Sequence, residues 1–322
     1  MERRKFVKQA IGAGVAVNLP FSLSAFEDLP VKPIRIGMVA DVHQDVVHDG
    51  VARLRFFMED MKQRKPDFII QLGDFSLPHN YNQPFLDIWN EFNGPRYHVL
   101  GNHDMRDHGY TRELTMEWWG MEKRYYSFDY EGFHFVVLDG NDPNPKPWSG
   151  YDRYINTKQQ QWLKADLDGT KLPVIVFSHQ SLEDEDGVAN KDEVRQILEN
   201  ARSSVGRSKV MACFSGHHHI DFIKEINGIH YVQVNSMSYK WVGGKYARKR
   251  FAEHIEQAYP HLRSTCLYKD PLYTVLTIDP GKQVLQLEGR STEFVAPTPH
   301  EIGVPWADEM HPTITERNIS FG

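Results

Sequence analysis

Cysteine is almost missing from this chain of 322 residues, which has only Cys213 and Cys266. Two thiols exclude a disulfide-dense scaffold and a cysteine-rich zinc module. Cys213 lies in an apolar run and is expected to be a buried thiol, while a single bond to Cys266 stays open. Positive charge is not in excess either, because 37 lysines and arginines stand against 43 acidic residues. The resulting net charge of −6 does not favour general binding to a nucleic-acid polymer.

The N-terminal region lacks a long apolar run. Residues 10–26 are mildly apolar, but Asn18 and Pro20 interrupt them, so they are too short for a membrane span. A basic start, residues 3–8 (RRKFVK), precedes them, and this order is typical of an export signal. The six residues resemble the twin-arginine signal, an address that a receptor reads. We therefore predict an export signal peptide at residues 1–26, with an amphipathic first helix as the alternative.

An export signal has consequences for the mature protein. The protein is expected in the periplasm or another extracytoplasmic compartment, after transient contact with the export machinery. Because the twin-arginine route carries folded proteins, any metal ions would be loaded before export. Residues 27–33 are expected to be a linker that follows the signal.

Five short apolar runs predict buried strands, because polar or turn-forming residues bound each of them. They are residues 34–40, 68–72, 96–100, 174–177 and 210–214. Between the first three runs, apolar residues recur at helical spacing. The later half contains hairpin signals instead, of which Asn227-Gly228 is the strongest. This order predicts an α/β fold in which two mixed β-sheets pack face to face as a sandwich flanked by helices.

The domain is expected to span residues 34–295. Residues 238–270 are predicted to be an insertion with helical character, and residues 296–322, which carry four prolines, a C-terminal tail. Two helix starts are also expected. Thr157 would cap one helix, and Asn190 with Glu193 would form a capping box at the start of another.

Metal-binding side chains follow the predicted strands, in a chain that contains 16 histidines. Ligands in open α/β sheets bind outside the carboxyl ends of the strands, and these ends meet at one edge. Oxygen and nitrogen donors stand at these ends: Asp41, His43, Asp74, Asn102, His103, His179, His217 and His219. Such donors suit Mn, Fe, Zn or Co in a catalytic site rather than a structural zinc. An aspartate able to bridge, with ligands on either side, fits two ions about 4 Å apart.

The order of these motifs resembles that of the calcineurin-like metallophosphoesterase superfamily. Five motifs occur in the family's order: residues 41–43 (DVH), 73–74 (GD), 101–104 (GNHD), His179 and residues 216–219 (GHHH). Each motif alone is weak, whereas the ordered set is specific. The resemblance covers residues 33–295 and implies a four-layer α/β/β/α fold that hydrolyses phosphate esters.

The resemblance also implies a role for each position. The ligands of a first metal ion would be Asp41, His43 and His219. The ligands of a second ion would be Asn102, His179 and His217, with Asp74 bridging both ions. His103 would face the substrate, as the general acid for the leaving group or as a stabiliser of the transition state. Asp104 would orient His103 or support the loop, and Gly101 would let the chain turn sharply.

The implied function is a dinuclear metal-dependent hydrolase of a small phosphate ester, with a hydroxide bridging the ions as the nucleophile. Asp74 is followed by Phe75-Ser76-Leu77-Pro78, so the arginine of the Ser/Thr protein phosphatases and the tyrosine ligand of the purple acid phosphatases are missing. These departures favour a phosphodiesterase. A broad phosphomonoesterase and a nucleotide pyrophosphatase are the alternatives, and a catalytically silent metal- or partner-binding protein is the non-enzymatic one. The oligomeric state stays open.

Specificity is expected to lie in the insertion, where basic and aromatic residues alternate. The candidates for substrate binding are Lys240, Trp241, Lys245 and Arg248. They would bind a distal phosphate or stack on a base. A solvated charged helix is the alternative interpretation.

Overall fold

The structure is a computed structural model that describes residues 32–105, 109–203 and 206–321. The predicted signal peptide at residues 1–26 and most of the predicted linker lie outside these residues. In the part of the chain that is described, no helix has both the length and the hydropathy needed to cross a bilayer.

The first sheet has six strands in the order β16-β13-β12-β1-β2-β3. Their bounds are β1 Ile34–Val39, β2 Phe68–Gln71, β3 Arg96–His98, β12 Thr274–Asp279, β13 Val284–Leu287 and β16 Arg317–Ser320. The three early strands run parallel to one another, and the three late strands are antiparallel to their neighbours. This mixed sheet contains three of the five predicted strands, and its β3 ends two residues earlier than the predicted run.

The second sheet also has six strands, in the order β4-β5-β6-β7-β9-β8. Their bounds are β4 Tyr126–Tyr130, β5 Phe133–Val137, β6 Val174–Phe177, β7 Val210–Ser215, β8 Phe222–Ile226 and β9 Ile229–Gln233. The four central strands, β5, β6, β7 and β9, are parallel to one another. The edge strands β4 and β8 are antiparallel to their neighbours. Asn227 and Gly228, both with positive φ, join β8 to β9 as the predicted hairpin turn.

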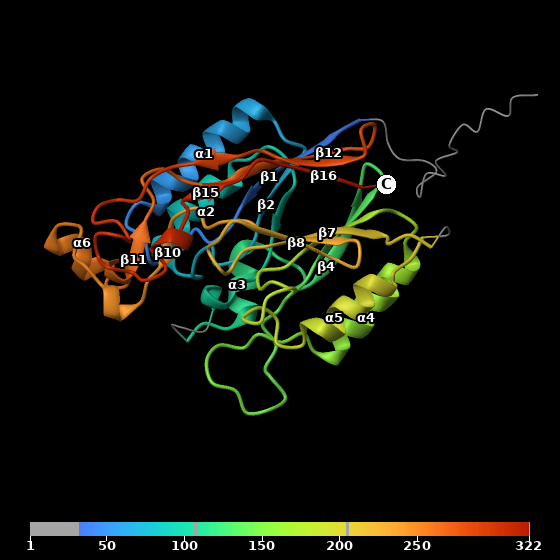
Figure 1. Ribbon diagram of the computed structural model, residues 1–322, viewed down its shortest axis with the longest axis horizontal. Coiled ribbons are helices and arrows are strands. Elements are labelled where there is room, and N and C mark those ends of the chain that lie inside the picture. Colours follow the sequence, from blue (N-terminus) through green and yellow to red (C-terminus); the bar gives the residue numbers. More distant parts are fainter. Residues whose placement is uncertain (1–31, 106–108, 204–205, 322) are drawn as a thin grey trace, which may run out of the picture.

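Helices cover the outer face of each sheet, as Figure 1 shows, with α1 on one side and α4 and α5 on the other. The first sheet is covered by α1 Gly50–Arg64, α2 Gln83–Asn90 and α3 Arg112–Trp119, and the second by α4 Thr157–Gly169 and α5 Lys191–Asn200. Side chains alternate along each strand, so Ile36 and Met38 enter the core between the sheets while Val39 packs under the helices. The predicted sandwich and its four-layer α/β/β/α arrangement are confirmed.

The two predicted helix caps are only partly confirmed, because α4 begins one residue earlier than its predicted cap implies and Asn190 stands at the N-cap position of α5 without forming the predicted box. Asn156 caps α4, since its side chain accepts from the N–H of Gln159 at 2.9 Å, and Thr157 is the first helical residue. Asn190 makes no capping bond to α5. Its amide instead binds both the N–H and the C=O of Ile155, at 3.0 and 2.9 Å, which ties the start of α5 to the loop before α4.

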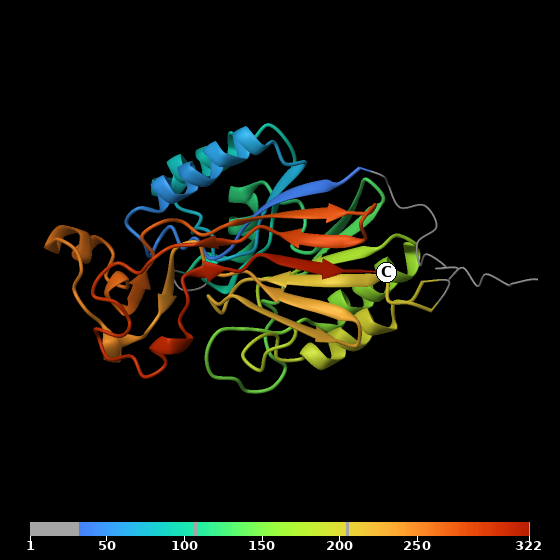
Figure 2. The ribbon, with the colours of Figure 1, turned by 45° about the horizontal axis from the view of Figure 1, so that its top comes forward.

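The predicted insertion is only partly helical. In residues 238–270, β10 Tyr239–Trp241 pairs antiparallel with β11 Thr265–Leu267, and α6 Glu253–Ala258 with the short turns η4 Gly244–Tyr246 and η5 Leu262–Ser264 lies between them. These elements form a lobe at one end of the sandwich, at the left of Figure 2. The strand pair fixes the position of β10 beside the carboxyl ends of the central strands, which is where a site is expected.

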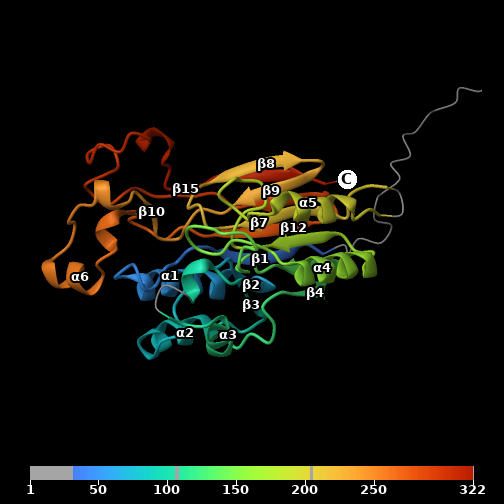
Figure 3. The ribbon, with the colours of Figure 1, turned by 90° about the horizontal axis from the view of Figure 1, so that it is seen from below.

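The predicted C-terminal tail is wrong, because the segment after residue 295 belongs to the domain. It contains the turn η6 Ala307–Glu309 and the strand β15 Thr313–Ile314, which pairs with β14 Arg290–Ser291. The last strand, β16, lies at the edge of the first sheet, where it pairs with β13. Figure 3 shows β15 between the lobe and the two sheets. Ile319 and Phe321 enter the core between the sheets. Four prolines masked this contribution, because the apolar residues between them are too few to show a period.

The two cysteines are both buried and do not pair. Cys213 on β7 packs under α4 and α5, and Cys266 on β11 packs in the lobe. The two thiols therefore lie in separate apolar clusters, and the disulfide left open by the sequence is not formed.

Candidate metal centre

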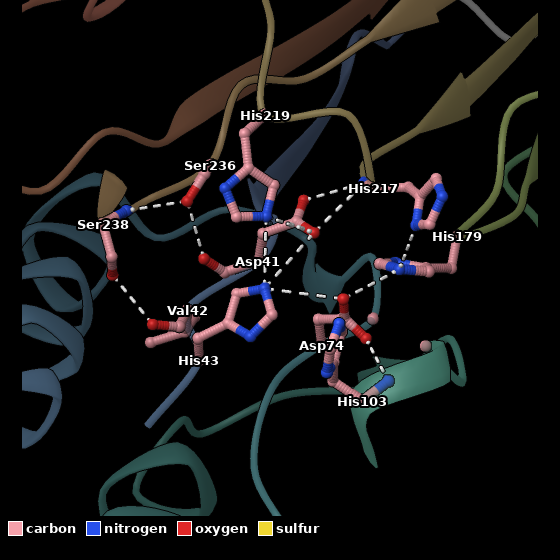
Figure 4. Close-up of polar contacts among 12 residues, drawn as sticks. Asp41, Val42, His43, Asp74, His103, His179, His217, His219, Ser236 and Ser238 are labelled. Carbon is pink, nitrogen blue, oxygen red and sulfur yellow. Dashed lines mark hydrogen bonds and ion pairs between the residues drawn. The ribbon is translucent and has the colours of Figure 1, made fainter. Parts of the chain in front are cut away.

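The carboxyl ends of five strands from both sheets meet at one point. Asp41 and His43 follow β1, Asp74 follows β2, and the turn η2 Asn102–Asp104 follows β3. From the second sheet, β6 delivers His179, and β7 delivers His217 and His219. In Figure 4 the labelled side chains of both sheets come together at one place: Asp41, His43, Asp74, His179, His217 and His219. The structure therefore brings together the strand ends that the sequence analysis selected.

A first group of donors consists of Asp41, His43 and His219, and one ligand atom from each lies within 4.8 Å of the others. The Nε2 atoms of His43 and His219 are 3.1 Å apart. The Nδ1–H of His219 donates to the carbonyl of Tyr239 at 2.7 Å, so its Nε2 presents a lone pair to the centre. Two imidazole nitrogens facing each other at this distance need a cation or a proton between them.

A second group consists of Asp74, His179 and His217, with ligand atoms again within 4.8 Å. His179 Nε2 lies 3.1 Å from Asp74 Oδ2, 3.2 Å from His217 Nδ1 and 3.2 Å from Asn102 Oδ1. The other nitrogen of His179 donates to the carbonyl of Leu72 at 2.8 Å. The amide oxygen of Asn102 is therefore a fourth donor for this group.

Asp74 connects the two groups, because its Oδ2 also lies 3.5 Å from His43 Nε2 (Figure 4). Burial and neighbouring imidazoles lower the pKa values of His43 and His217, which keeps their lone pairs available. Burial would raise the pKa of Asp74, but His179 and His103 outweigh it and lower this pKa. Burial would lower the pKa of His179, but the Asp74 carboxylate outweighs it and raises this pKa to about 9, so a metal ion at this position would displace a proton. Imidazole and carboxylate donors that converge in two adjacent groups fit two metal ions, and Asp74 is placed to bridge them.

The backbone at the centre is strained. Five of the expected ligands have a positive φ, between 50° and 73°: Asp41, His43, Asp74, His217 and His219. Such a conformation costs about 1 kcal/mol or more for a residue other than glycine and persists only where the surrounding structure imposes it. This concentration of strain agrees with a site in which donor direction takes precedence over local stability.

Two motif glycines provide room for the donors. Gly101 has φ −95° and ψ 169°, an extended conformation that other residues adopt, so the expected sharp turn is not its reason. A Cβ atom there would lie 2.2 Å from the backbone N of Asp74. A Cβ atom on Gly216 would lie 2.4 Å from Asp41 Oδ2. Each glycine therefore lets one motif approach the carboxylate of another.

Asp104, which was expected to orient His103 or to support the loop, is placed to support the loops. Its carboxylate accepts from the backbone N–H groups of Asp74, Phe75, Ser76 and Gly101, at 2.7 to 3.2 Å. Burial and the nearby Asp74 carboxylate raise the pKa of Asp104, and the backbone donors oppose that shift. With both oxygens engaged by two motif loops, Asp104 holds these loops in register and does not present a free oxygen to a substrate.

His103 lines a groove of about 490 Å³ beside the two donor groups. We call this the His103 groove; it is bordered by His43, Asp74 and His103 on one side, by the 45–46 and 75–81 loops on the second, and by Trp241 and residues 258–261 of the lobe on the third. The backbone N–H of His103 donates to Asp74 Oδ1 at 2.8 Å. The ring of His103 is therefore held next to the donors but directed to the groove.

The four expected substrate residues are separated. Trp241 lines the His103 groove, with its ring centroid 6.5 Å from that of His103. Lys240 lies on the other side of β10, where its Nζ donates to the carbonyl of His218 at 2.6 Å, and burial lowers its pKa to about 8. Lys245 and Arg248 are exposed and do not line the groove. Side chains alternate along β10, and this alternation separates Lys240 from Trp241.

Sequence reasoning missed several residues that support the donors. Ser236 and Ser238 donate to the carbonyls of Asp41 and Val42, both at 2.8 Å (Figure 4). These two serines follow the buried strand β9, and polar residues after a buried strand are the same signal that identified the ligands. The hydroxyl of Tyr151, from the loop between β5 and α4, lies 2.6 Å from Nε2 of His217. An exposed tyrosine in an irregular loop had no such signal.

The fold and the paired donor groups define a dinuclear metallophosphoesterase. A profile of the calcineurin-like phosphoesterase family matches residues 34–221, more than half of the chain. The chain belongs to this family and is a hydrolase of phosphoric ester bonds. No curated protein matches the chain.

Among solved structures, the chain is similar to a dimetal phosphatase from Danio rerio, with a TM-score of 0.59 and 14% identity, over 91% of this chain and 100% of that chain. It is also similar to GAP50, the anchor in the inner membrane complex of Plasmodium, with a TM-score of 0.55 and 15% identity, over 90% of this chain and 89% of that chain. At these identities the likeness concerns the fold. Since a phosphatase and an anchor share this fold, the function of this chain has to be inferred from its own donor residues.

Proposed function

We propose that this phosphoesterase is a phosphodiesterase for small substrates, in which His103 protonates the leaving group. The observation that supports a diester is the charge of the His103 groove. Among the described residues that line it, none is a lysine or an arginine. A phosphomonoester carries nearly two negative charges at neutral pH, because its second pKa is about 6, whereas a diester carries one. A diester therefore needs less positive charge than a monoester from the chain.

The first donor group would hold one metal ion, and the second, with Asn102, the other; Mn, Fe, Zn and Co all suit these donors. When bound, the two ions neutralise the phosphate charge and supply a water-derived nucleophile. The protein side chains position the reacting groups. The bond from His103 N–H to Asp74 Oδ1 holds the turn that carries the imidazole against the carboxylate that both groups share.

His103 is the proposed acid because its ring lines the groove and none of the described donor groups includes it. A proton passes from a nitrogen of this ring to the ester oxygen as the alcohol departs, which is the step that general acid catalysis accelerates. Asp104 contributes by fixing the Asp74 and Gly101 loops, so that the donors and the acid keep their spacing.

The test compares bis(p-nitrophenyl) phosphate with p-nitrophenyl phosphate, using protein stripped of metal and reloaded with Mn²⁺, Fe²⁺, Zn²⁺ or Co²⁺. We expect kcat/KM for the diester to exceed that for the monoester by about tenfold or more. A preference for the monoester would contradict the diesterase and favour the phosphomonoesterase. Absence of hydrolysis with every metal would contradict the proposed catalytic centre.

We also propose that the chain is exported by the twin-arginine route. The support is the basic residues 3–8 ahead of a short apolar stretch. Replacing Arg3 and Arg4 together by lysine keeps the charge and removes the motif. We expect the doubly substituted protein to stay in the cytoplasm while the parent reaches the periplasm, as cell fractionation would report. Equal distribution of both proteins would contradict the route.

A further inference from the structure

The His103 groove has two walls that come from different parts of the chain. Trp241, Pro260 and His261 of the lobe form one wall. Val46, Leu77 and Tyr81 from the loops after β1 and β2 form the other. Both walls are mainly apolar or aromatic, although the groove begins at a highly polar centre. A substrate that reaches from His103 into the groove therefore leaves charged surroundings and enters apolar ones.

Trp241 is held in place as a platform. Its strand β10 pairs with β11, and its indole meets the buried ring of Tyr239 edge-on at 5.0 Å. The planes of Trp241 and His103 are inclined by only 29°. The indole is partly exposed, so one portion of it is available to a ligand. A rigid aromatic side chain binds another ring with little loss of conformational entropy.

The opposite wall is held by Asp45. Its Oδ1 accepts from the Tyr81 hydroxyl at 2.5 Å, and its Oδ2 accepts from the N–H of Leu77 at 2.7 Å. Both carboxylate oxygens are thus used to fix the wall. Asp45 nevertheless leaves a negative charge beside the groove, and the strand alternation of β10 puts the Lys240 ammonium on the far side of the strand.

We propose that the His103 groove binds an uncharged aromatic leaving group of the phosphodiester, with Trp241 as the stacking surface that determines this preference. The inference rests on the proposed function and adds the substrate class to it. In this arrangement the ester oxygen lies next to His103. The ring centroids of His103 and Trp241 are 6.5 Å apart, so an aryl or heteroaryl group within a few bonds of that oxygen reaches Trp241. A second phosphate or a carboxylate in the leaving group meets Asp45 instead of a cation.

The first experiment uses two diesters with leaving alcohols of similar acidity, so that the chemical step is matched: methyl 1-naphthyl phosphate and methyl hexafluoroisopropyl phosphate. With the metal-loaded protein, we expect kcat/KM to favour the naphthyl ester by about tenfold. Trp241→Ala should abolish this preference by lowering kcat/KM for the naphthyl ester alone. Trp241→Phe should keep part of the preference. The matched control is Trp306→Ala, because Trp306 is an exposed tryptophan of the same end of the molecule that does not line the groove.

A ratio near one in the parent protein, or an equal loss for both esters in Trp241→Ala, would overturn the inference. A sulfonated naphthyl ester tests the charge. We expect it to lose about tenfold relative to the naphthyl ester because of the Asp45 carboxylate. Equal or faster hydrolysis of the sulfonated ester would overturn the uncharged part of the assignment.

A binding measurement separates this inference from the proposed function. The monomethyl ester of 1-naphthylmethylphosphonic acid carries the ring on a bond that is not hydrolysed, and its affinity for the metal-loaded protein is measured by calorimetry. We expect Trp241→Ala to weaken the affinity for this compound about tenfold. The affinity for the control compound, which carries a methyl group in place of the naphthylmethyl group, should not change. If the ring-dependent affinity is present but no diester is hydrolysed, the proposed function fails and the groove assignment stands. If diesters are hydrolysed without ring-dependent affinity, the groove assignment fails.

Discussion

The two donor groups of the centre differ in what stands behind them. In the first group, every ligand is buried, and the outer nitrogen of His219 donates to the main-chain carbonyl of Tyr239 on β10. In the second group, His217 is only half-buried, and its outer nitrogen meets the side chain of Tyr151 on a loop. One group is thus built into the packed core, and the other depends in part on an exposed segment. We expect the second group to release its ion first, because loop contacts open at a lower free-energy cost than core contacts.

The largest expected effect comes from removing the residue that the two groups share. Asp74→Asn keeps an oxygen that can accept from the His103 N–H but removes the charge between His43 and His179. We expect both metal positions to weaken and kcat/KM to fall by about 10³-fold or more. Metal content after dialysis and the rate of diester hydrolysis measure the effect. Full occupancy of one position would show that Asp74 does not bridge.

The next effect separates metal holding from proton transfer. His103→Ala leaves both donor groups intact, so we expect two bound ions together with a fall in kcat of about 10²- to 10⁴-fold. The loss should be smaller for an ester whose leaving group needs no proton, such as p-nitrophenolate, than for a methyl ester. Turnover equal to that of the parent protein on both esters would exclude His103 as the acid.

The third prediction addresses the difference between the two groups directly. Tyr151→Phe removes the hydroxyl that fixes His217 and keeps the ring. We expect one of the two ions to bind about tenfold more weakly, because supporting contacts of a metal-ligating histidine typically contribute this much. Competition with a chelator reports both affinities. If both metal affinities fell equally, or if neither changed, the loop would not distinguish the two groups.

The smallest effect concerns a histidine outside the centre, which lies between two carboxylates. Burial would lower the pKa of His134, but the carboxylates of Asp166 and Asp129, at 2.8 and 2.6 Å, outweigh it and raise the pKa. A raised pKa means stability that is fully present below the unfolded value and is lost as pH rises through the folded value. We expect His134→Gln to lower the free energy of unfolding by about 1 kcal/mol at pH 5.5 and by less at pH 8.5. Denaturant titrations at the two pH values measure this, and a difference independent of pH would contradict it.

Patterns that repeat locally in the chain were sufficient for the central part of the fold. The apolar runs before Asp41, Asp74 and His179 marked buried strands, and the rule that ligands collect at the carboxyl ends of strands placed these residues at one edge. The rule worked because these runs are buried on both faces along most of their length, so only Arg35 and Gln71 interrupt their apolar sequence. The strand pair of the lobe and β16 were missed because their apolar residues are spread between turns and prolines.

The roles of individual side chains depended on directions that spacing does not encode. Asp104 was expected to orient His103 or to support the loop, and the choice between these roles needed the four backbone N–H groups that two separate loops direct at it. Trp241 and Lys240 are adjacent in the sequence and lie in different cavities, because a strand directs successive side chains to opposite faces. Adjacent positions were therefore a poor guide to a shared function.

By itself, the sequence determined the type of each donor and the order in which the strands deliver them, because residue type decides which atoms can bind a metal ion and apolar runs decide which strands are buried. Only the tertiary structure brings the donors of each group together, since they come from different strands, and His43 and His219 are 176 positions apart in the sequence. It also decided that Tyr151 lies behind His217 and that Trp241 faces His103. Those contacts form when the two sheets pack and long loops close, and neither event produces a periodic pattern of apolar residues in the sequence.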